Sequence, residues 1–150
     1  MASIPAPAQA LLGSDAVAHV WTSNPDGSPQ VSVVWVIVQG DDVVFGCDGS
    51  SAKAENLRRD PHVILSIEDD ERNERGFQRH LVIRGRATVQ DGPDPALMDK
   101  LADKYLGLDR HPLWSLRDSP GAVVVRVEID RISGVGPWVD ADETTGLVDR

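Results

Sequence analysis

The hydrophobic pattern of this chain is a series of short β-like segments joined by tight turns. Runs of β-branched and aromatic residues predict strands at 16–22, 30–38, 42–47, 62–68, 79–90 and 121–133. The links that follow the first two runs are turn sequences, too short for the helix that joins parallel strands. We therefore expect about six antiparallel strands, and a doubly wound α/β fold is excluded.

A glycine inside the fifth predicted strand indicates that the sheet closes on itself. Gly85 interrupts the run 79–90, and a glycine within a strand marks a bulge or a tight barrel bend. We therefore expect a mainly β fold, an antiparallel barrel with a few helices at its periphery.

The remaining segments are predicted to be short helices, one acidic loop and two tails. Helices are predicted at 4–12, 93–107 and 112–117, with another after Ser51. The acidic stretch 69–78 is predicted to be a solvated loop, and 1–6 and 140–150 loose tails. The length of 150 residues suits a single domain.

Composition limits the classes of function. The formal net charge of −9 argues against a general nucleic-acid binder, which needs a positive field. Cys47 is the only cysteine, so no internal disulfide can form, and a reducing cytoplasm fits. We expect no stable membrane insertion, because no run has the length and hydrophobicity of a membrane span. The four histidines lack metal-ligand spacing, so no metal site is predicted.

The start of the helix after Ser51 poses a chemical question. Ser50 or Ser51 is a helix N-cap candidate, and Lys53 falls in the first turn, where a cation opposes the helix dipole by about 0.3–1 kcal/mol. A bound anion would remove that penalty and use the same backbone groups. Two interpretations stay open, an anion site or a plain cap beside a solvated lysine, and spacing alone favours the cap.

Three segments carry a family resemblance in their order and spacing. They are DGSPQVSVVWVIVQGDDVVFGCDGSSAKAENLRRDP at 26–61, VIRGRATV at 82–89 and RISGVGPW at 131–138. Together they resemble the split β-barrel flavin and deazaflavin oxidoreductases, the superfamily of the pyridoxamine 5′-phosphate oxidases, in its coenzyme F420-dependent branch. The resemblance covers roughly 7–139. It implies a six-stranded antiparallel split barrel and a homodimer with two cofactor sites between the subunits.

The resemblance also implies a set of cofactor-binding residues. A phosphate would sit at the start of the helix, the flat ring against a strand, and the ribityl chain beside a cysteine. A cap would come from the second subunit, for which Pro137 and Trp138 are the candidates. The implied residues are Ser32, Val33, Val34, Trp35, Cys47, Ser50, Ser51, Ala52, Lys53, Asn56, Pro137 and Trp138.

The function implied by the resemblance is hydride transfer. The leading hypothesis is an F420H2-dependent reductase acting on a small conjugated organic molecule, with F420 as the cofactor and no catalytic side chain assigned. One alternative is an FMN-dependent oxidase or reductase on the same barrel. Another is a non-catalytic protein that binds a flavin, F420 or haem.

Overall fold

The computed structural model describes residues 3–107 and 117–139. Its elements in chain order are α1 (Ala6–Gly13), β1 (Ala18–Ser23), β2 (Pro29–Val34), β3 (Ile37–Gln39), β4 (Asp42–Asp48), α2 (Ala52–Arg59), β5 (His62–Arg72), β6 (Gln78–Asp91), α3 (Pro95–Leu106) and β7 (Ala122–Val135). The helix predicted at 112–117 lies outside the described residues except for Arg117.

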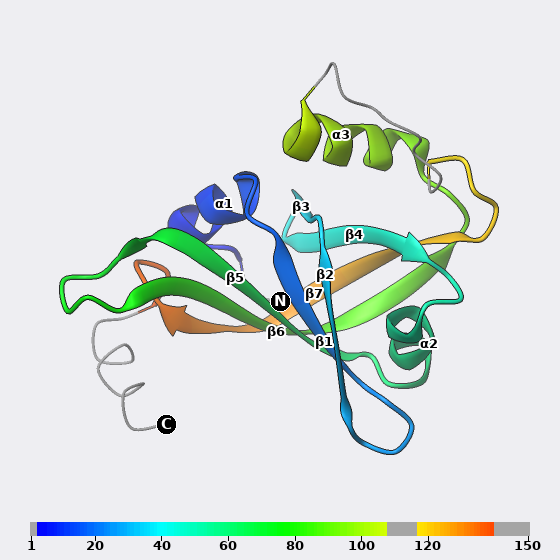
Figure 1. The fold of residues 1–150 in the computed structure, drawn as a ribbon, viewed down its shortest axis with the longest axis horizontal. Coiled ribbons are helices and arrows are strands. Elements are labelled where there is room, and N and C mark those ends of the chain that lie inside the picture. The colour runs from blue at the N-terminus through cyan, green and yellow to red at the C-terminus, as the bar shows by residue number, and fades with distance from the viewer. Residues whose placement is uncertain (1–2, 108–116, 140–150) are drawn as a thin grey trace.

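The strands form one antiparallel sheet in the order β2-β1-β5-β6-β7-β4-β3, which confirms the mainly β, antiparallel prediction (Figure 1). The predicted count of about six is wrong, because the run 30–38 breaks at Trp35 and Val36 into β2 and β3. These two strands are the opposite edges of the sheet, yet only two residues join them. At 3.8 Å per residue, the Cα atoms of Val34 and Ile37 lie within about 11 Å of each other. The sheet must therefore curl until its edges nearly meet.

A long hairpin replaces the loop predicted at 69–78. β5 continues to Arg72 and β6 begins at Gln78, so only 73–77 is a turn. The sequence pattern did not predict this extension, because its side chains are charged and show no apolar alternation. The pairing has a register irregularity after Glu68 and resumes at Arg72, which lies opposite Gln78.

The predicted irregularity at Gly85 is confirmed. The register of β6 against β7 shifts between Arg84 and Gly85. A β-carbon on Gly85 would lie 2.3 Å from the backbone oxygen of Glu128, so no other residue fits without backbone movement.

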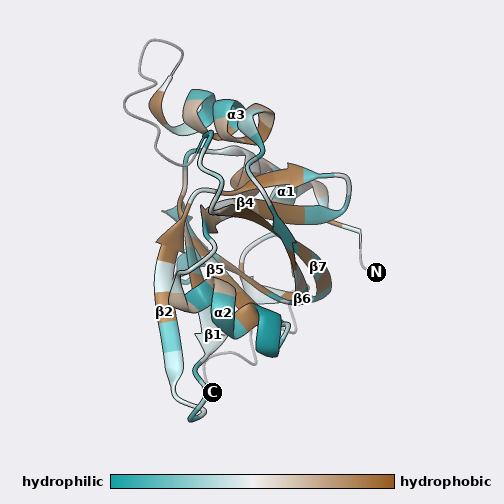
Figure 2. Ribbon diagram, turned by 90° about the vertical axis from the view of Figure 1, so that its right-hand side faces the viewer, coloured by the Kyte–Doolittle hydropathy of each residue, from teal (hydrophilic) through white to brown (hydrophobic). Residues whose placement is uncertain are grey.

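Two apolar clusters hold the elements together. The main core fills the inside of the curled sheet and includes the face of α1 and of α2 that points toward it. Ile4 packs in this core at 4% exposure, so the predicted loose start does not extend to it. A smaller cluster joins α3 to Val44 and Val124. Figures 1 and 2 place α3 and α2 on different sides of β4.

Candidate cofactor-binding site

The first turn of α2 is a capped helix start. Ser51 is the N-cap, and its Oγ accepts a hydrogen bond of 3.3 Å from the backbone N–H of Ala54. The same hydroxyl donates to the Sγ of Cys47 at 3.7 Å, a weak acceptor. The capping interpretation of Ser51 is therefore confirmed, and it leaves part of the helix end unsatisfied.

The unsatisfied groups are two backbone donors and one ammonium. Among the described residues, the N–H groups of Ala52 and Lys53 have no acceptor, as is usual at a helix N-terminus. The half-buried Lys53 side chain has no ion pair or hydrogen bond within the described part of the chain. Positive charge at a helix N-terminus favours an anion there. A plain cap and an anion site are therefore compatible at this helix start.

A cavity of about 360 Å³ adjoins this turn. Its lining includes six residues of the predicted set, which are Val33, Val34, Trp35, Cys47, Ser51 and Lys53. The strand β2 and the link after it supply the apolar members, and the end of β4 and the start of α2 supply the others. The cavity thus has an apolar wall and one polar end, which carries the Ser51 hydroxyl, the Lys53 ammonium and Asp48.

Four lining residues were missed by sequence reasoning. They are Gly46, Asp48, Met98 and Leu101. Met98 and Leu101 are three apart on the apolar face of α3, a spacing that is typical of helix packing and does not indicate a cavity. No signal in the sequence places α3 beside β4, because the contact joins segments that lie about fifty residues apart in the chain.

The polar end of the cavity also includes a carboxyl group and a thiol. Two hydrogen bonds from Ser50, one from its backbone N–H and one from its hydroxyl, lower the pKa of Asp48. The Asp48 carboxylate is thus ionised at neutral pH and turned toward Ser50. Burial raises the pKa of the Cys47 thiol, so this cysteine is a protonated wall group.

The structure does not bring Ser32, Ser50 or Ala52 into the cavity lining. Ser32 pairs with Val20 on the inner face of the sheet, and its buried Oγ has no hydrogen-bond partner among the described residues. The exposed hydroxyl of Ser50 donates to Asp48. Ala52 is exposed, and its free backbone N–H is its contribution to the helix start.

Asn56 also lies away from the cavity. It is 3% exposed, and its Nδ2 donates to Thr22 Oγ1 and to Asn24 Oδ1, both at 3.0 Å. Its Oδ1 accepts from Arg59 at 3.3 Å. The amide is thus engaged in joining α2 to β1 and its turn, which leaves it unavailable to a ligand.

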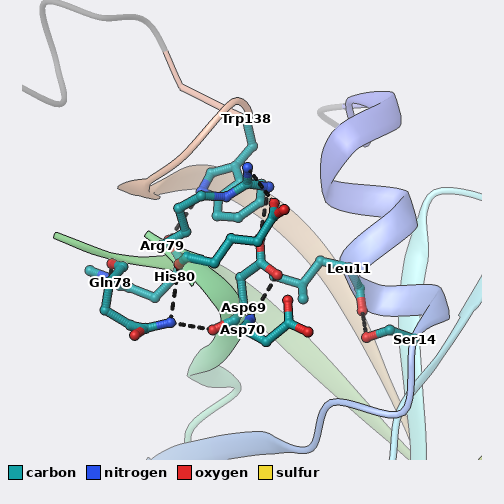
Figure 3. A network of polar contacts seen from close by, with 9 residues as sticks. Leu11, Ser14, Asp69, Asp70, Gln78, Arg79, His80 and Trp138 are labelled. Carbon is teal, nitrogen blue, oxygen red and sulfur yellow. Dashed lines mark hydrogen bonds and ion pairs between the residues drawn. The ribbon is translucent and has the colours of Figure 1, made fainter. Parts of the chain in front are cut away.

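Pro137 and Trp138 follow β7 and do not line the cavity. Trp138 is 6% exposed, and its Nε1 donates to the backbone oxygen of His80 at 3.0 Å. Figure 3 shows the Arg79 guanidinium beside the Trp138 ring, with its centre 5.5 Å from the ring centroid. Arg79 in turn pairs with Asp69 at 2.7 Å. The indole is therefore buried within its own chain, whereas Pro137 is exposed.

The described residues contain no group of His, Cys, Asp and Glu side chains that could hold a metal ion. None of the described helices is both long and apolar enough to cross a membrane.

The curled antiparallel sheet with a cavity between a strand edge and a helix start is typical of flavin-binding split barrels. The family model of pyridoxamine 5′-phosphate oxidase matches residues 4–136, so the chain belongs to that family. This confirms the superfamily that the sequence resembles. No protein of curated function matched the chain.

Solved structures give the same fold. An F420 reductase superimposes with a TM-score of 0.70 at 29% identity, over 87% of this chain and 98% of that chain. A conserved hypothetical protein from Mycobacterium tuberculosis has a TM-score of 0.70 at 24% identity, over 89% and 87%. A heme binding protein from Mycobacterium smegmatis has a TM-score of 0.64 at 20% identity, over 88% of this chain and 53% of that chain. The last two likenesses concern the fold alone.

Proposed function

We propose that this protein is an F420H2-dependent reductase of small conjugated organic molecules. One observation carries the proposal: the apolar cavity ends at a helix N-terminus with two free N–H groups and the Lys53 ammonium. Such a site fits a flat, uncharged ring joined to a phosphate. The likeness to an F420 reductase at 29% identity favours the deazaflavin over FMN.

The residues present fit a flavin-type group, and each has a distinct task. Lys53 and the free N–H groups of Ala52 and Lys53 bind the phosphate. Val33 and Trp35, together with the backbone of Val34, cover the ring and exclude water from it. The coenzyme supplies the hydride when it is bound, so the chain needs no nucleophilic side chain.

Titration of the purified protein with F420 and with FMN tests the proposal, with tryptophan fluorescence as the signal. We expect F420 to bind more tightly than FMN. Lys53→Met should weaken F420 binding by roughly tenfold, the value of one charge-assisted hydrogen bond. Lys100→Met, an exposed lysine on α3, is the matched control and should change nothing. Equal affinity of wild type and Lys53→Met would refute the phosphate site.

Turnover separates the reductase from its alternatives. Reduced F420 with a panel of enones and quinones should be oxidised in the presence of the protein. A protein purified with a tightly bound flavin spectrum supports the FMN-dependent enzyme. Tight binding of flavin, F420 or haem with no turnover supports a carrier protein.

A second copy of the chain would complete the proposed site. An exposed apolar strip lies on the outside of β1, β2 and the residue before β1. It consists of Val17, Trp21, Val31 and Val33, each 38% to 56% exposed. Trp21 and Val31 are cross-strand neighbours, and Val33 also lines the cavity. Apolar patches of this kind mark protein interfaces. A partner on this strip would cover the open side of the cavity, so we propose a homodimer. A cytoplasmic location stays a prediction.

Sedimentation equilibrium tests the homodimer. Val31→Lys places a charge in the strip and should give monomers that bind F420 weakly. Phe77→Lys is the matched control, since Phe77 is 42% exposed at the tip of the β5–β6 hairpin, away from the strip. A Val31→Lys variant that stays dimeric would place the interface elsewhere.

A further inference from the structure

Helix α3 forms one wall of the cavity but is joined to the barrel by few side chains. Its apolar face packs in the small cluster with Val44 and Val124, separate from the main core. Met98 and Leu101 belong to that cluster and also line the cavity. The position of α3 therefore sets the shape of the proposed cofactor site.

The link between β2 and β3 has a hydrogen-bonding problem. Val36 lies between the two strands, so its N–H and C=O take no part in the ladder, and its side chain is fully buried. Buried backbone groups without partners are strongly unfavourable. Tyr105 Oη accepts from the Val36 N–H at 3.2 Å, and Lys104 Nζ donates to the Val36 carbonyl. Two adjacent residues of α3 thus satisfy the break in the sheet.

The same two side chains also bind the end of α1 and the link between α1 and β1. Lys104 Nζ also donates to the carbonyl of Leu12, the last buried residue of α1. Tyr105 Oη donates to the carbonyl of Ala16 at 2.8 Å. The last turn of α3 therefore joins α1, the link between α1 and β1, and the β2–β3 link at one point.

Tyr105 connects the last turn of α3 to the wall of the cavity. Its ring stacks on Trp35 with centroids 5.1 Å apart and planes 6° from parallel, and Trp35 lines the cavity. The Lys104 ammonium lies over the Tyr105 ring, 4.7 Å from its centroid. Any shift of the α3 terminus would move the Trp35 ring.

The lysine holds this place at an energetic disadvantage. Burial lowers the pKa of Lys104 to about 8, and the Asp15 charge opposes that effect only in part. An apolar side chain would avoid the desolvation of the amine but would leave the Leu12 and Val36 carbonyls without this donor. The amine is therefore suited to fixing the backbone rather than to filling space.

We propose that Lys104 and Tyr105 are positioning residues that latch α3 to the β2–β3 link and thereby hold Trp35 as a wall of the cofactor site. This inference rests on the proposed function for the identity of the ligand. Its geometric part, the latch, concerns the free protein alone.

Hydrogen exchange of the free protein tests the latch. In Tyr105→Phe the Val36 amide loses its acceptor, so it should exchange at least tenfold faster, together with the amides of α3. Val125, in β7 between β4 and β6, should keep its protection. Lys104→Met should have the same pattern, and Lys100→Met should match wild type. Unchanged exchange at Val36, or an equal loss of protection across the whole sheet, would overturn the proposal.

A double-mutant cycle tests whether the latch acts through Trp35. Tyr105→Phe should weaken F420 binding about five- to tenfold, the loss of one or two hydrogen bonds. In a Trp35→Leu background the same change should have no further effect, because the wall is already absent. Additive losses would overturn the role of Trp35. If wild type binds neither F420 nor FMN, the proposed function fails, and the exchange experiment still decides the latch.

Discussion

Gly46 and Met98 share one space beside the cavity. A β-carbon on Gly46 would lie 2.1 Å from the Met98 Cε, so α3 approaches β4 as closely as a side-chain-free position permits. The Met98 methyl is the end of a flexible side chain, which can rotate away at small cost. The end of the Met98 side chain therefore fills the space above Gly46.

Replacement of both residues should be less harmful than the sum of the single changes. Met98→Ala should lower the free energy of unfolding by about 2–5 kcal/mol, because it leaves a cavity. Gly46→Ala alone should lower it less, by about 1 kcal/mol, because the flexible Met98 side chain can move aside. In the double variant the new methyl occupies space that Met98 vacates, so the losses should not add. Urea unfolding measures all three, and strict additivity would contradict the contact.

Ser51 permits a separation of capping from anion binding. Ser51→Ala should lower the free energy of unfolding by about 1 kcal/mol through loss of the cap. Ser51→Asp keeps a capping oxygen and suits the helix dipole, so stability should stay near wild type. Its negative charge should nevertheless weaken F420 binding by tenfold or more, as measured by fluorescence titration. Unchanged affinity in Ser51→Asp would remove the anion from this turn.

Asn56 should matter for stability and not for the ligand. Asn56→Ala leaves Thr22 and Asn24 without their amide donor, which should lower the free energy of unfolding by about 1–3 kcal/mol. Affinity for F420, measured well below the unfolding temperature, should match wild type. Glu55→Ala, at an exposed position in the first turn of the same helix, is the control: it should lower the free energy of unfolding only by about 0.3–1 kcal/mol, through the lost helix-dipole interaction, and should not weaken F420 binding. A large loss of affinity in Asn56→Ala would return Asn56 to the binding site.

Lys104 should make stability depend on pH above neutrality. Its pKa is about 8 in the folded protein and 10.5 ordinarily, so between these values the unfolded chain binds more protons. The free energy of unfolding should therefore rise as pH increases from 8 toward 10.5. Burial raises the pKa of Tyr105 above its ordinary value of 10.0, which acts in the opposite direction only at higher pH. Denaturant unfolding between pH 7 and 9.5 should show the rise in wild type and Lys100→Met, and a smaller rise in Lys104→Met.

Local sequence was sufficient for most strands and for the start of α2. Alternating residues and short turns defined the antiparallel sheet, and Gly85 marked its bulge. Ser51 and Lys53 stood out because N-cap chemistry and the helix dipole depend on neighbours in the chain. These features arise from interactions within a few residues, which a sequence pattern records directly.

Other features depended on contacts between distant segments. The run 30–38 looked like one strand, and only closure of the sheet decides that it breaks at Trp35. The polar stretch 69–72 became part of β5 because β6 offered backbone partners there. Charged side chains on a two-stranded arm leave no apolar alternation to detect.

The sequence by itself determined the class of fold and the helix start at which an anion can bind, since both follow from local periodicity and backbone geometry. Only the tertiary structure decided which residues surround that helix start. It brought Met98 and Leu101 to the cavity and turned Asn56 and Trp138 into buried structural groups. The reason is physical: burial and hydrogen-bond partners are properties of the packed chain, and the same residue types serve either role until packing selects one.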